Sequence, residues 1–323
     1  MDIRNVTQVR VFVLSGLTDN EELVPFLFLF FLLVYLMTIL GNVGMMGVVY
    51  KTSSLHTPMY FFLIYLSMID LCYSSVITPK VLLDLLSKVK SISFTGCALQ
   101  FFFFAVFSGT EVLLLSIMSY DRYIAICHPL HYVLIMTNKR CLSLVLLSLS
   151  IAFFQAILQT ICVFSLQYCG SNLIDHFYCD VLPLLTLSCS STLPCEIITI
   201  FFTCSCGVSS MMTIVISYTL IVSSILRIRS GEGRQKAFST CSSHLMCVFM
   251  LYGTVFFIYL RPSSSHFEKQ DKVVSVFYLV VIPMLNPLIY SLRNKEVKKV
   301  IMKAVQKCHL LVLHHQKQGV TEA

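Results

Sequence analysis

Seven long apolar segments divide this chain, and short polar stretches separate them. Each segment holds about 20 residues or more, the length that an α-helix needs to cross the hydrocarbon core of a bilayer. Inside that core a helix satisfies its backbone hydrogen bonds within its own segment. We therefore predict an all-α membrane protein, a bundle of seven transmembrane helices. The predicted spans are Val24 to Tyr50, Met59 to Leu82, Cys97 to Ile126, Cys141 to Phe164, Ile197 to Leu226, Phe238 to Leu260 and Val273 to Leu292.

The composition agrees with a chain that lies mostly in a membrane. Of its 323 residues, 57% are hydrophobic and only 12% are charged, whereas about a quarter of the residues in a soluble domain are charged. We expect one membrane domain, with an N-terminal segment over 1–23, the helix bundle over 24–292 and a tail over 293–323. The net charge of +7 does not indicate nucleic acid, because basic residues at membrane borders follow from topology alone.

The distribution of basic residues predicts which end of the bundle faces the cytoplasm. With the N-terminus outside, 15 of the 23 Lys and Arg residues lie on the inner side and 8 on the outer side, and cytoplasmic loops normally hold this excess. The N-terminus is then extracellular, and we expect Asn5 in the sequon Asn5-Val6-Thr7 to be a glycosylation site. No cleaved signal peptide is apparent. After the seventh span, interleaved basic and apolar residues predict a short amphipathic helix on the inner leaflet, with the C-terminus inside.

Cysteines gather in the longest outer loop, Ser165 to Glu196, and at the start of the third span. An oxidising exterior favours disulfides, and the lack of CxxC or Cys/His pairs at ligand spacing disfavours zinc. The cysteines on this side are Cys97, Cys169, Cys179, Cys189 and Cys195, and the sequence leaves their connectivity open. We expect the other nine to act as small hydrophobic side chains. These are Cys72, Cys127, Cys141, Cys162, Cys204, Cys206, Cys241, Cys247 and Cys308.

The inner end of the third span holds Asp121, Arg122 and Tyr123 where the apolar run should meet water. Charged side chains at this depth are costly, so they usually have a function. Glu111 lies eleven residues before Arg122, which is about three helical turns and about 16 Å along one helix face. One helix therefore carries a polar group in mid-membrane and a charged pair at its inner end. The alternative is that Arg122 only anchors the helix at the lipid headgroups.

The string MSYDRYIAICHPLHY, Met118 to Tyr132, resembles the signature of olfactory receptors within the rhodopsin-like G-protein-coupled receptors. Further strings resemble the same family, occur in its order and touch six of the seven spans. They are Gly41-Asn42, LHTPMYFFL (Leu55 to Leu63), Leu66-Ser67 with Asp70, Ser217-Tyr218, KAFSTCSSHL (Lys236 to Leu245) and PMLNPLIYSLRN (Pro283 to Asn294). Their forms look like the larger tetrapod branch (class II), which mostly handles airborne odorants.

The resemblance implies a disulfide pairing and also shows small departures from the family pattern. It pairs Cys97 with Cys179 and Cys169 with Cys189, which leaves Cys195 unpaired. The departures are at Ser119, Ser242 and Leu251, where other residues are usual in the family. Tyr252 stands where most rhodopsin-like receptors have Trp, as in olfactory relatives.

The resemblance also assigns a switch to the inner half of the bundle. Asp121 would neutralise Arg122 at rest, Arg122 would meet the G protein after activation, and Tyr218 and Tyr290 would hold the open form. Pro283 and Pro287 remove backbone donors and kink the seventh helix, where Asn286 can satisfy a freed carbonyl. The kink gives this helix two arrangements of similar energy. A purely structural kink is the alternative. The residues assigned to coupling and switching are Asp121, Arg122, Tyr123, Tyr218, Asn286, Pro287 and Tyr290.

Asp70 and Glu111 are acids inside apolar spans, and burying ionised carboxylates is expensive unless they are paired or protonated. In the wider receptor class the acid of the second span binds sodium. The resemblance therefore implies a sodium site with Asp70, Glu111 and Asn42. The alternative is a protonated acid that only fixes helix packing. Apart from this ion, we expect no cofactor.

The resemblance places a ligand pocket among the outer halves of the third, fifth, sixth and seventh spans. Phe104, Ser108 and Glu111 follow a helical spacing that puts them on one face. Such a pocket is mostly apolar, and no acid lies near Phe104, which argues against a biogenic amine. Simple helix packing is the alternative for each aromatic residue. The predicted ligand-binding residues are Phe104, Ala105, Ser108, Phe202, Thr203, Cys206, Tyr252, Val255, Phe256 and Tyr259.

Together these features predict an odorant receptor and not an enzyme. A small, volatile, mostly apolar molecule would bind within the bundle, and a stimulatory olfactory G protein would raise cyclic AMP. The resemblance implies the plasma membrane of olfactory cilia as the location and export chaperones as further partners. A chemosensory receptor outside the olfactory epithelium is the nearest alternative. A channel or transporter is disfavoured because no internal repeat or filter sequence is present, and a membrane enzyme because no nucleophile motif is present.

Overall fold

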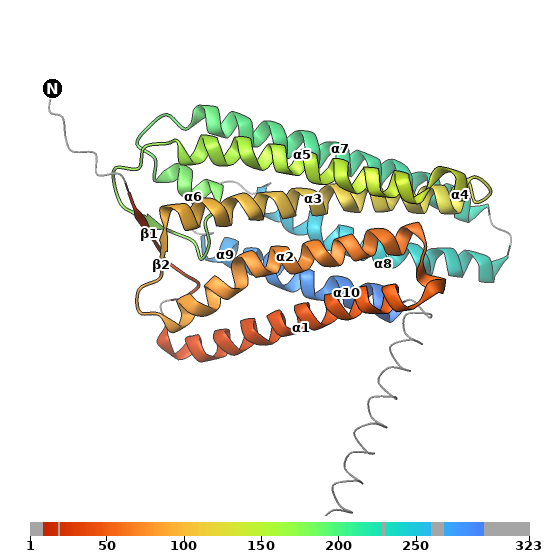
Figure 1. Cartoon of the computed structure of the whole chain (residues 1–323), viewed down its shortest axis with the longest axis horizontal. Helices are drawn as coiled ribbons and strands as arrows, with labels where there is room; N and C mark the ends of the chain where they lie inside the picture. Colours follow the sequence, from red (N-terminus) through yellow and green to blue (C-terminus); the bar gives the residue numbers. More distant parts are fainter. Residues whose placement is uncertain (1–8, 19, 228–229, 260–267, 294–323) are drawn as a thin grey trace, which may run out of the picture.

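The structure of the chain is a computed structural model that describes residues 9–18, 20–227, 230–259 and 268–293. Within these residues, seven helical units lie side by side along the long axis of the molecule (Figure 1). The first six are α1 (Val24–Lys51), α2 (Pro58–Leu86), α3 (Phe94–Cys127), α5 (Asn138–Phe164), α7 (Leu193–Leu226) and α8 (Gly231–Tyr259). The seventh consists of α9 (Glu268–Val276), the π-helical η3 (Phe277–Val281) and α10 (Ile282–Arg293). The predicted seven-helix fold is confirmed.

Short elements lie in the connections at both ends of the bundle. We call the end that carries the N-terminal segment the outer end and the opposite end the inner end, as the predicted orientation places them. Near the outer end are η1 (Glu21–Leu23) and α6 (Val181–Thr186), and at the inner end are η2 (Ser53–Leu55) and α4 (Tyr132–Ile135).

Six helical stretches of the described residues are long and apolar enough to cross a bilayer, judged by length and composition. α8 has sufficient length with 29 residues, but Glu232 and Arg234 in its first turns make it less apolar. Large apolar side chains such as Phe26, which is 73% exposed, cover the outward faces. A surface of this kind suits contact with lipid, as the predicted membrane location requires.

Helix ends follow from side chains that cap them. Ser93 Oγ accepts a hydrogen bond from the Gly96 backbone at 3.0 Å, so α3 begins three residues before its predicted start at Cys97. Thr137 caps α5 in the same way. α2 begins with Pro58, a residue that suits the first turn because its missing N–H is not needed there.

α3 is the central helix of the bundle. It packs against α2, α5, α7 and α8, and Leu114 and Leu115 at its middle are almost fully buried in the main apolar core. Gly109 allows α5 to come close, because a Cβ at this position would lie 3.2 Å from the Cβ of Ala152. The position of α3 therefore sets the positions of its neighbours.

A small sheet covers the outer end. Its central strand β1 (Val11–Leu14) pairs antiparallel with β2 (Ser91–Ser93) and parallel with β3 (Leu173–Ile174). Phe12 on β1 is fully buried, and its ring meets Tyr168 edge-on at 5.4 Å. The N-terminal segment is thus tied to two loops, an arrangement that the all-α prediction did not include.

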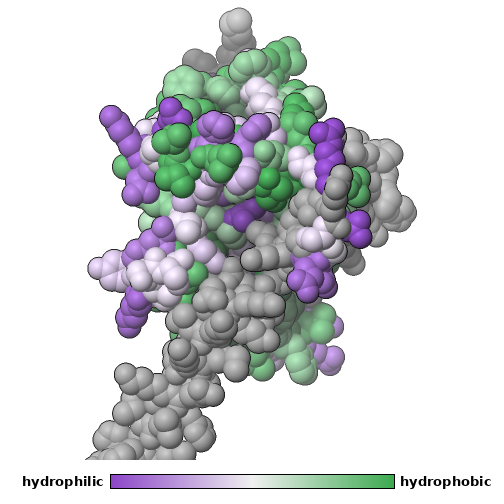
Figure 2. Space-filling view, turned by 90° about the vertical axis from the view of Figure 1, so that its right-hand side faces the viewer, coloured by the Kyte–Doolittle hydropathy of each residue, from purple (hydrophilic) through white to green (hydrophobic). Residues whose placement is uncertain are grey.

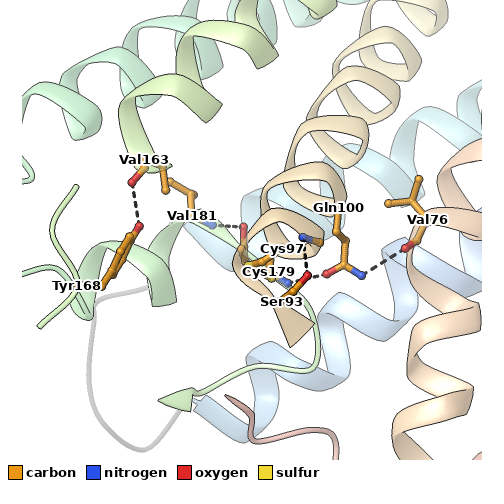
Figure 3. Close-up of a disulfide and its surroundings, with 10 residues drawn as sticks. Val76, Ser93, Cys97, Gln100, Val163, Tyr168, Cys179 and Val181 are labelled. Atoms are coloured by element: carbon orange, nitrogen blue, oxygen red, sulfur yellow. Dashed lines mark hydrogen bonds between the residues drawn. A yellow bond between two sulfur atoms is a disulfide. The ribbon is translucent and has the colours of Figure 1, made fainter. Parts of the chain in front are cut away.

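Three disulfides lie at the outer end in the described residues, and two of them join the pairs implied by the resemblance, Cys97–Cys179 and Cys169–Cys189. Figure 3 shows how the first is held. Gln100 on α3 accepts a hydrogen bond from the Cys179 backbone at 3.0 Å and donates to the Val76 carbonyl on α2 at 3.3 Å. The long outer loop is therefore fixed to both α2 and α3.

The third disulfide joins Cys162 to Cys195 and corrects two predictions. Cys195 is not unpaired, and Cys162 is not a free small hydrophobic residue. Cys162 lies near the outer end of α5, Cys195 lies in the first turn of α7, and their Cα atoms are 5.5 Å apart. The bond joins the outer ends of α5 and α7 on the oxidising side of the membrane.

Several predictions concern parts of the chain outside the described residues. The glycosylation site at Asn5 is one of these. The amphipathic helix and the cytoplasmic tail beyond Arg293 are another, and so is the last predicted residue of the sixth span, Leu260.

Gly41 marks a close approach of α1 and α10, since a Cβ there would lie 3.0 Å from Cγ of Pro287. We expect Gly41→Leu to push these helices apart, at a cost of about 1–3 kcal/mol, and to lower the amount of receptor at the cell surface severalfold. Gly44→Leu on the same helix should behave like wild type, because a Cβ there meets nothing within 4 Å. Surface immunolabelling relative to total protein measures the difference, and equal surface levels would contradict it.

Candidate functional site

A cavity of about 420 Å³ lies between the helices in the outer half of the bundle. α3, α5, α7, α8 and the seventh helical unit form its walls, together with residues of the loop between α5 and α7. Its volume falls within the range of small-molecule sites. Phe104, Ser108 and Glu111 all line it, so the face of α3 that the spacing predicts does point into the cavity.

The cavity brings together most of the predicted ligand-binding residues. Phe202 is not among the lining residues, and its ring packs against Phe154 of α5 and Phe201. Successive helix residues point about 100° apart, and the neighbouring residue takes the inward position. The side chains of Val255, Phe256 and Tyr259 lie outside the described part of the structure. The predicted residues that line the cavity are Phe104, Ala105, Ser108, Thr203, Cys206 and Tyr252.

Two groups of cavity residues were missed from the sequence. The first is a polar strip formed by Gln155 and Gln159 of α5 with Thr199 of α7. The four-residue spacing of two glutamines in an apolar span was a signal that could have found it. The second group comes from the outer loop and includes Asp175 and His176. No helical periodicity marks loop residues, so only the fold reveals them.

A charged network closes one edge of the cavity. Lys272 of α9 donates to Asp175 Oδ1 at 2.7 Å and to Ser15 Oγ at 2.8 Å, and Ser15 donates to Asp175 Oδ1 at 2.8 Å. The hydrogen bond from Lys272 is the main reason why the pKa of Asp175 is lowered, so the carboxylate stays charged at neutral pH. The network joins the N-terminal segment, the outer loop and the seventh helical unit.

His176 lies beside this network and is 6% exposed. Its Nε2 is 3.5 Å from Ser275 Oγ, and its Nδ1 has no hydrogen-bond partner among the described residues. Burial, reinforced by the charge of Lys272, lowers the pKa of His176 from 6.5 to about 3. The ring is therefore neutral at physiological pH. A second contact between loop and helix joins the hydroxyls of Tyr178 and Tyr278 at 2.6 Å.

A buried polar group lies at the inner side of the cavity. Asn286 Nδ2 donates to both carboxylate oxygens of Asp70, at 3.2 and 3.0 Å, and Glu111 is a neighbouring buried acid. Three buried oxygens have no hydrogen-bond partner in the described residues: Glu111 Oε1, Asn42 Oδ1 and Asn286 Oδ1. Unpaired oxygens beside carboxylates are the kind of donors that hard cations take.

In the seventh helical unit, the carbonyl that Pro287 leaves free has a different hydrogen-bond donor from the expected Asn286. Pro287 cannot donate to the carbonyl of Pro283, which is four residues earlier. Asn42 Nδ2 of α1 donates to that carbonyl at 3.0 Å. Asn286, which was expected to satisfy a freed carbonyl, instead binds Asp70 because its side chain faces α2. Tyr290 is buried in the main apolar core.

The charged pair of α3 lies within the inner end of the bundle. Arg122 Nη2 is 3.9 Å from Asp121 Oδ2, and Tyr132 of α4 donates to Asp121 Oδ1 at 2.9 Å. Arg122 is 8% exposed, and its Nη2 has no hydrogen-bond partner in the described residues. Tyr123 points to the loop instead, where its hydroxyl is 3.1 Å from His128 Nε2.

Figure 2 shows the inner end face on, with hydrophilic side chains around its edge and apolar ones between them.

Two polar contacts hold α8 against α7 and α3. In the inner half, His244 Nδ1 is 2.8 Å from the Tyr218 hydroxyl of α7, and its Nε2 is 3.0 Å from a backbone carbonyl of α3. Beside the cavity, Tyr252 donates to Ser210 Oγ at 2.7 Å, and Ser210 donates to the α3 backbone at 2.8 Å. A movement of α8 must therefore break hydrogen bonds at two levels.

A seven-helix membrane bundle with a small-molecule cavity in its outer half and a buried Asp–Arg pair at the inner end of α3 defines the class of G-protein-coupled receptors. The olfactory receptor family model matches residues 31–308. Olfactory receptor 5AP2 of Mus musculus is 54% identical over 93% of this chain and 95% of its own. Olfactory receptor 8U1 of Homo sapiens is 51% identical over 93% of this chain and 97% of its own.

Olfactory receptor 5B12 of Homo sapiens is likewise 51% identical, over 94% of this chain and 97% of its own. The chain belongs to the olfactory receptor family. It is therefore a multi-pass membrane receptor and not an enzyme, and its partners in general are a small molecule and a G protein.

Acid should destabilise this receptor through His176. The unfolded chain takes up a proton below the ordinary pKa of 6.5, whereas the folded ring resists protonation down to its pKa of about 3. Stability therefore falls as the pH falls below about 6.5, and the loss attributable to this ring reaches about 2 kcal/mol at pH 5. Asp175, with its lowered pKa, stays charged in this range in the folded state.

We expect the melting temperature of the purified receptor to drop less between pH 7 and pH 5 in His176→Gln than in wild type. His131→Gln is the matched control, because His131 is exposed at the inner end. If His176→Gln and wild type lose the same stability over this range, the buried ring is not the acid-sensitive group.

Proposed function

We propose that this chain is an odorant receptor that binds small, volatile, mostly apolar molecules in the cavity and activates a stimulatory olfactory G protein, so that cyclic AMP rises. The observation that carries the proposal is the layout of α3. Phe104, Ser108 and Glu111 line the cavity, and Arg122 is buried at the inner end of the same helix. One helix thus connects the ligand to the surface that a G protein would contact.

The contacts of α8 supply a mechanism. Tyr252 lines the cavity and donates a hydrogen bond to Ser210, so a ligand that displaces its ring would break this bond. The same helix carries His244, which holds Tyr218 and α3 at the inner half. An outward movement of α8 would break these contacts and open a path to Arg122. A ligand that binds the open arrangement more tightly shifts the population toward it.

The loop after α3 offers the surface that the G protein would contact. Leu130 is 90% exposed and Val133 is 77% exposed, three residues apart in the stretch that contains α4. Exposed apolar side chains that are close together mark an interaction site on a protein surface. Tyr132 of the same loop binds Asp121, so a partner that contacts this loop also acts on the charged pair of α3.

We further propose that the receptor functions in the plasma membrane of olfactory cilia, with export chaperones assisting its delivery. The same mechanism would serve a chemosensory receptor in another tissue. The family membership supports the olfactory role, and the site of expression in tissue sections distinguishes the two.

A sodium ion between α2 and α3 is part of the proposal. Asp70 and Glu111 would supply negative charge to the ion. The amide nitrogen of Asn42 has no hydrogen left for them, because Nδ2 already donates to the carbonyls of Thr38 and Pro283. Its Oδ1 is therefore available as a neutral oxygen ligand. The ion would offset the repulsion of two buried carboxylates, and it would favour the resting arrangement in which they are close.

Arg122→Ala should abolish odorant-evoked cyclic AMP, because the mechanism requires its guanidinium at the opened inner end. The measurement is a cyclic AMP response across a broad odorant panel at matched surface expression. Arg140→Ala is the control, since Arg140 is an exposed arginine of the same end, and it should respond as wild type does. A full response from Arg122→Ala would overturn the proposed coupling.

Replacing external sodium with choline should raise basal cyclic AMP in the wild-type receptor. In the double variant Asp70→Asn with Glu111→Gln, basal signalling should not depend on sodium. Asp84→Asn changes an acid of α2 that pairs with Lys80 outside this site, so it should keep the sodium dependence. Sodium dependence that survives in the double variant would show that the ion acts elsewhere.

A further inference from the structure

Two glutamines form an unusual part of the cavity wall. Gln155 and Gln159 lie one turn apart on α5, and both side chains line the cavity. They are 9% and 6% exposed, so they are nine-tenths buried in a part of the bundle that would otherwise be apolar.

Most of the hydrogen-bonding capacity of this wall is unused. Gln155 Oε1 accepts a weak bond from the Cys206 thiol at 3.5 Å, whereas the amide nitrogen of Gln155 and the whole side chain of Gln159 have no hydrogen bond among the described residues. Thr199 Oγ1, on the facing turn of α7, is buried and also without a partner there. A buried hydroxyl left without a partner is costly, and the two glutamines line the cavity beside it, so this strip is suited to a polar group that arrives with the ligand.

The chemistry of the strip restricts that group. Amides and a hydroxyl both donate and accept hydrogen bonds and carry no charge, so they fit a neutral oxygen function. The described lining residues include Glu111, Asp175, Asp180 and Asp271 but no Lys or Arg. A carboxylate ligand would therefore find no lining cation to offset its desolvation and would be repelled, since Lys272 at the cavity edge is already paired with Asp175.

The wall toward α2 has the opposite character. Tyr73 and Phe104 stack there with ring centroids 5.6 Å apart, and Leu251 of α8 lies on the same cavity. These side chains suit a hydrocarbon. A ligand in this cavity thus meets a polar strip between α5 and α7 and an apolar wall toward α2.

We propose that the strip formed by Gln155, Gln159 and Thr199 binds the oxygen of a neutral, oxygen-bearing odorant, an alcohol, aldehyde, ketone or ester, whose hydrocarbon part lies against Tyr73, Phe104 and Leu251. This inference rests on the proposed odorant function and names its ligand class. Gln155 and Gln159 act as specificity residues, because they select the functional group and not the length of the chain.

The test measures ligand binding without the G protein. The melting temperature of the purified full-length receptor is measured with each member of a matched panel of eight-carbon probes. The panel contains octane, 1-octanol, octanal, 2-octanone, octanoate and octylamine. We expect the neutral oxygen-bearing probes to raise the melting temperature at the lowest concentrations, and octanoate not to raise it. A panel in which octanoate or octane binds best, or in which no oxygen-bearing probe binds, overturns the inference.

The variants identify the strip as the binding element. Gln159→Leu keeps the approximate size of the side chain and removes the amide. The variant should bind the oxygen-bearing probes about tenfold more weakly, the effect of losing one hydrogen bond. Its affinity for octane should be unchanged or higher. Gln159→Asn should retain part of the binding. Gln167→Leu, an exposed glutamine of the outer loop, should match wild type. An equal loss of affinity for octane and for 1-octanol in Gln159→Leu would show that Gln159 has a structural role and would overturn the inference.

Signalling separates this inference from the proposed function. If the oxygen-bearing probes bind through Gln159 but no panel compound raises cyclic AMP, the proposed coupling fails while the ligand class stands. If odorants raise cyclic AMP with the same half-maximal concentration in wild type and Gln159→Leu, the receptor function stands and the role of the strip is refuted.

Discussion

A bilayer core offers no hydrogen bonds, so every polar side chain on a membrane helix depends on a partner inside the bundle. In this receptor many of those bonds end on α3 or beside it. Ser210 reaches its backbone from α7, His244 reaches it from α8, and Tyr132 reaches Asp121 from the loop that follows. Because each bond joins α3 to a different neighbour, the placement of this helix decides where both the cavity and the inner surface form.

The features that could be predicted from the sequence are those with a local pattern. Apolar length identifies the spans, and the spacing from Phe104 to Glu111 identifies the face of α3 that points into the cavity. Phe202 shows the limit of this reasoning, since its ring packs against Phe154 of α5 while the next residue, Thr203, lines the cavity. Cys162 shows another limit, because an apolar run looks the same whether or not a partner such as Cys195 approaches it.

Contacts between distant segments explain the remaining differences. Asn42 satisfies the carbonyl that Pro287 leaves free, although the two residues are on the first and last helices. The cavity edge needs Ser15, Asp175 and Lys272 from three separate regions. Each of these residues is unremarkable in its own stretch of sequence, so their roles become visible only when the helices are assembled.

The sheet at the outer end imposes an order on biosynthesis. β1 is made first, but its two partner strands begin at Ser91 and Leu173, and Ser15 bonds to Lys272 only after nearly the whole chain has been translated. The first strand must therefore wait in the lumen with unpaired backbone edges while the later helices are inserted. A chain that stalls before its seventh helix therefore has an unfinished outer surface, in which Ser15 and Asp175 lack the bonds from Lys272.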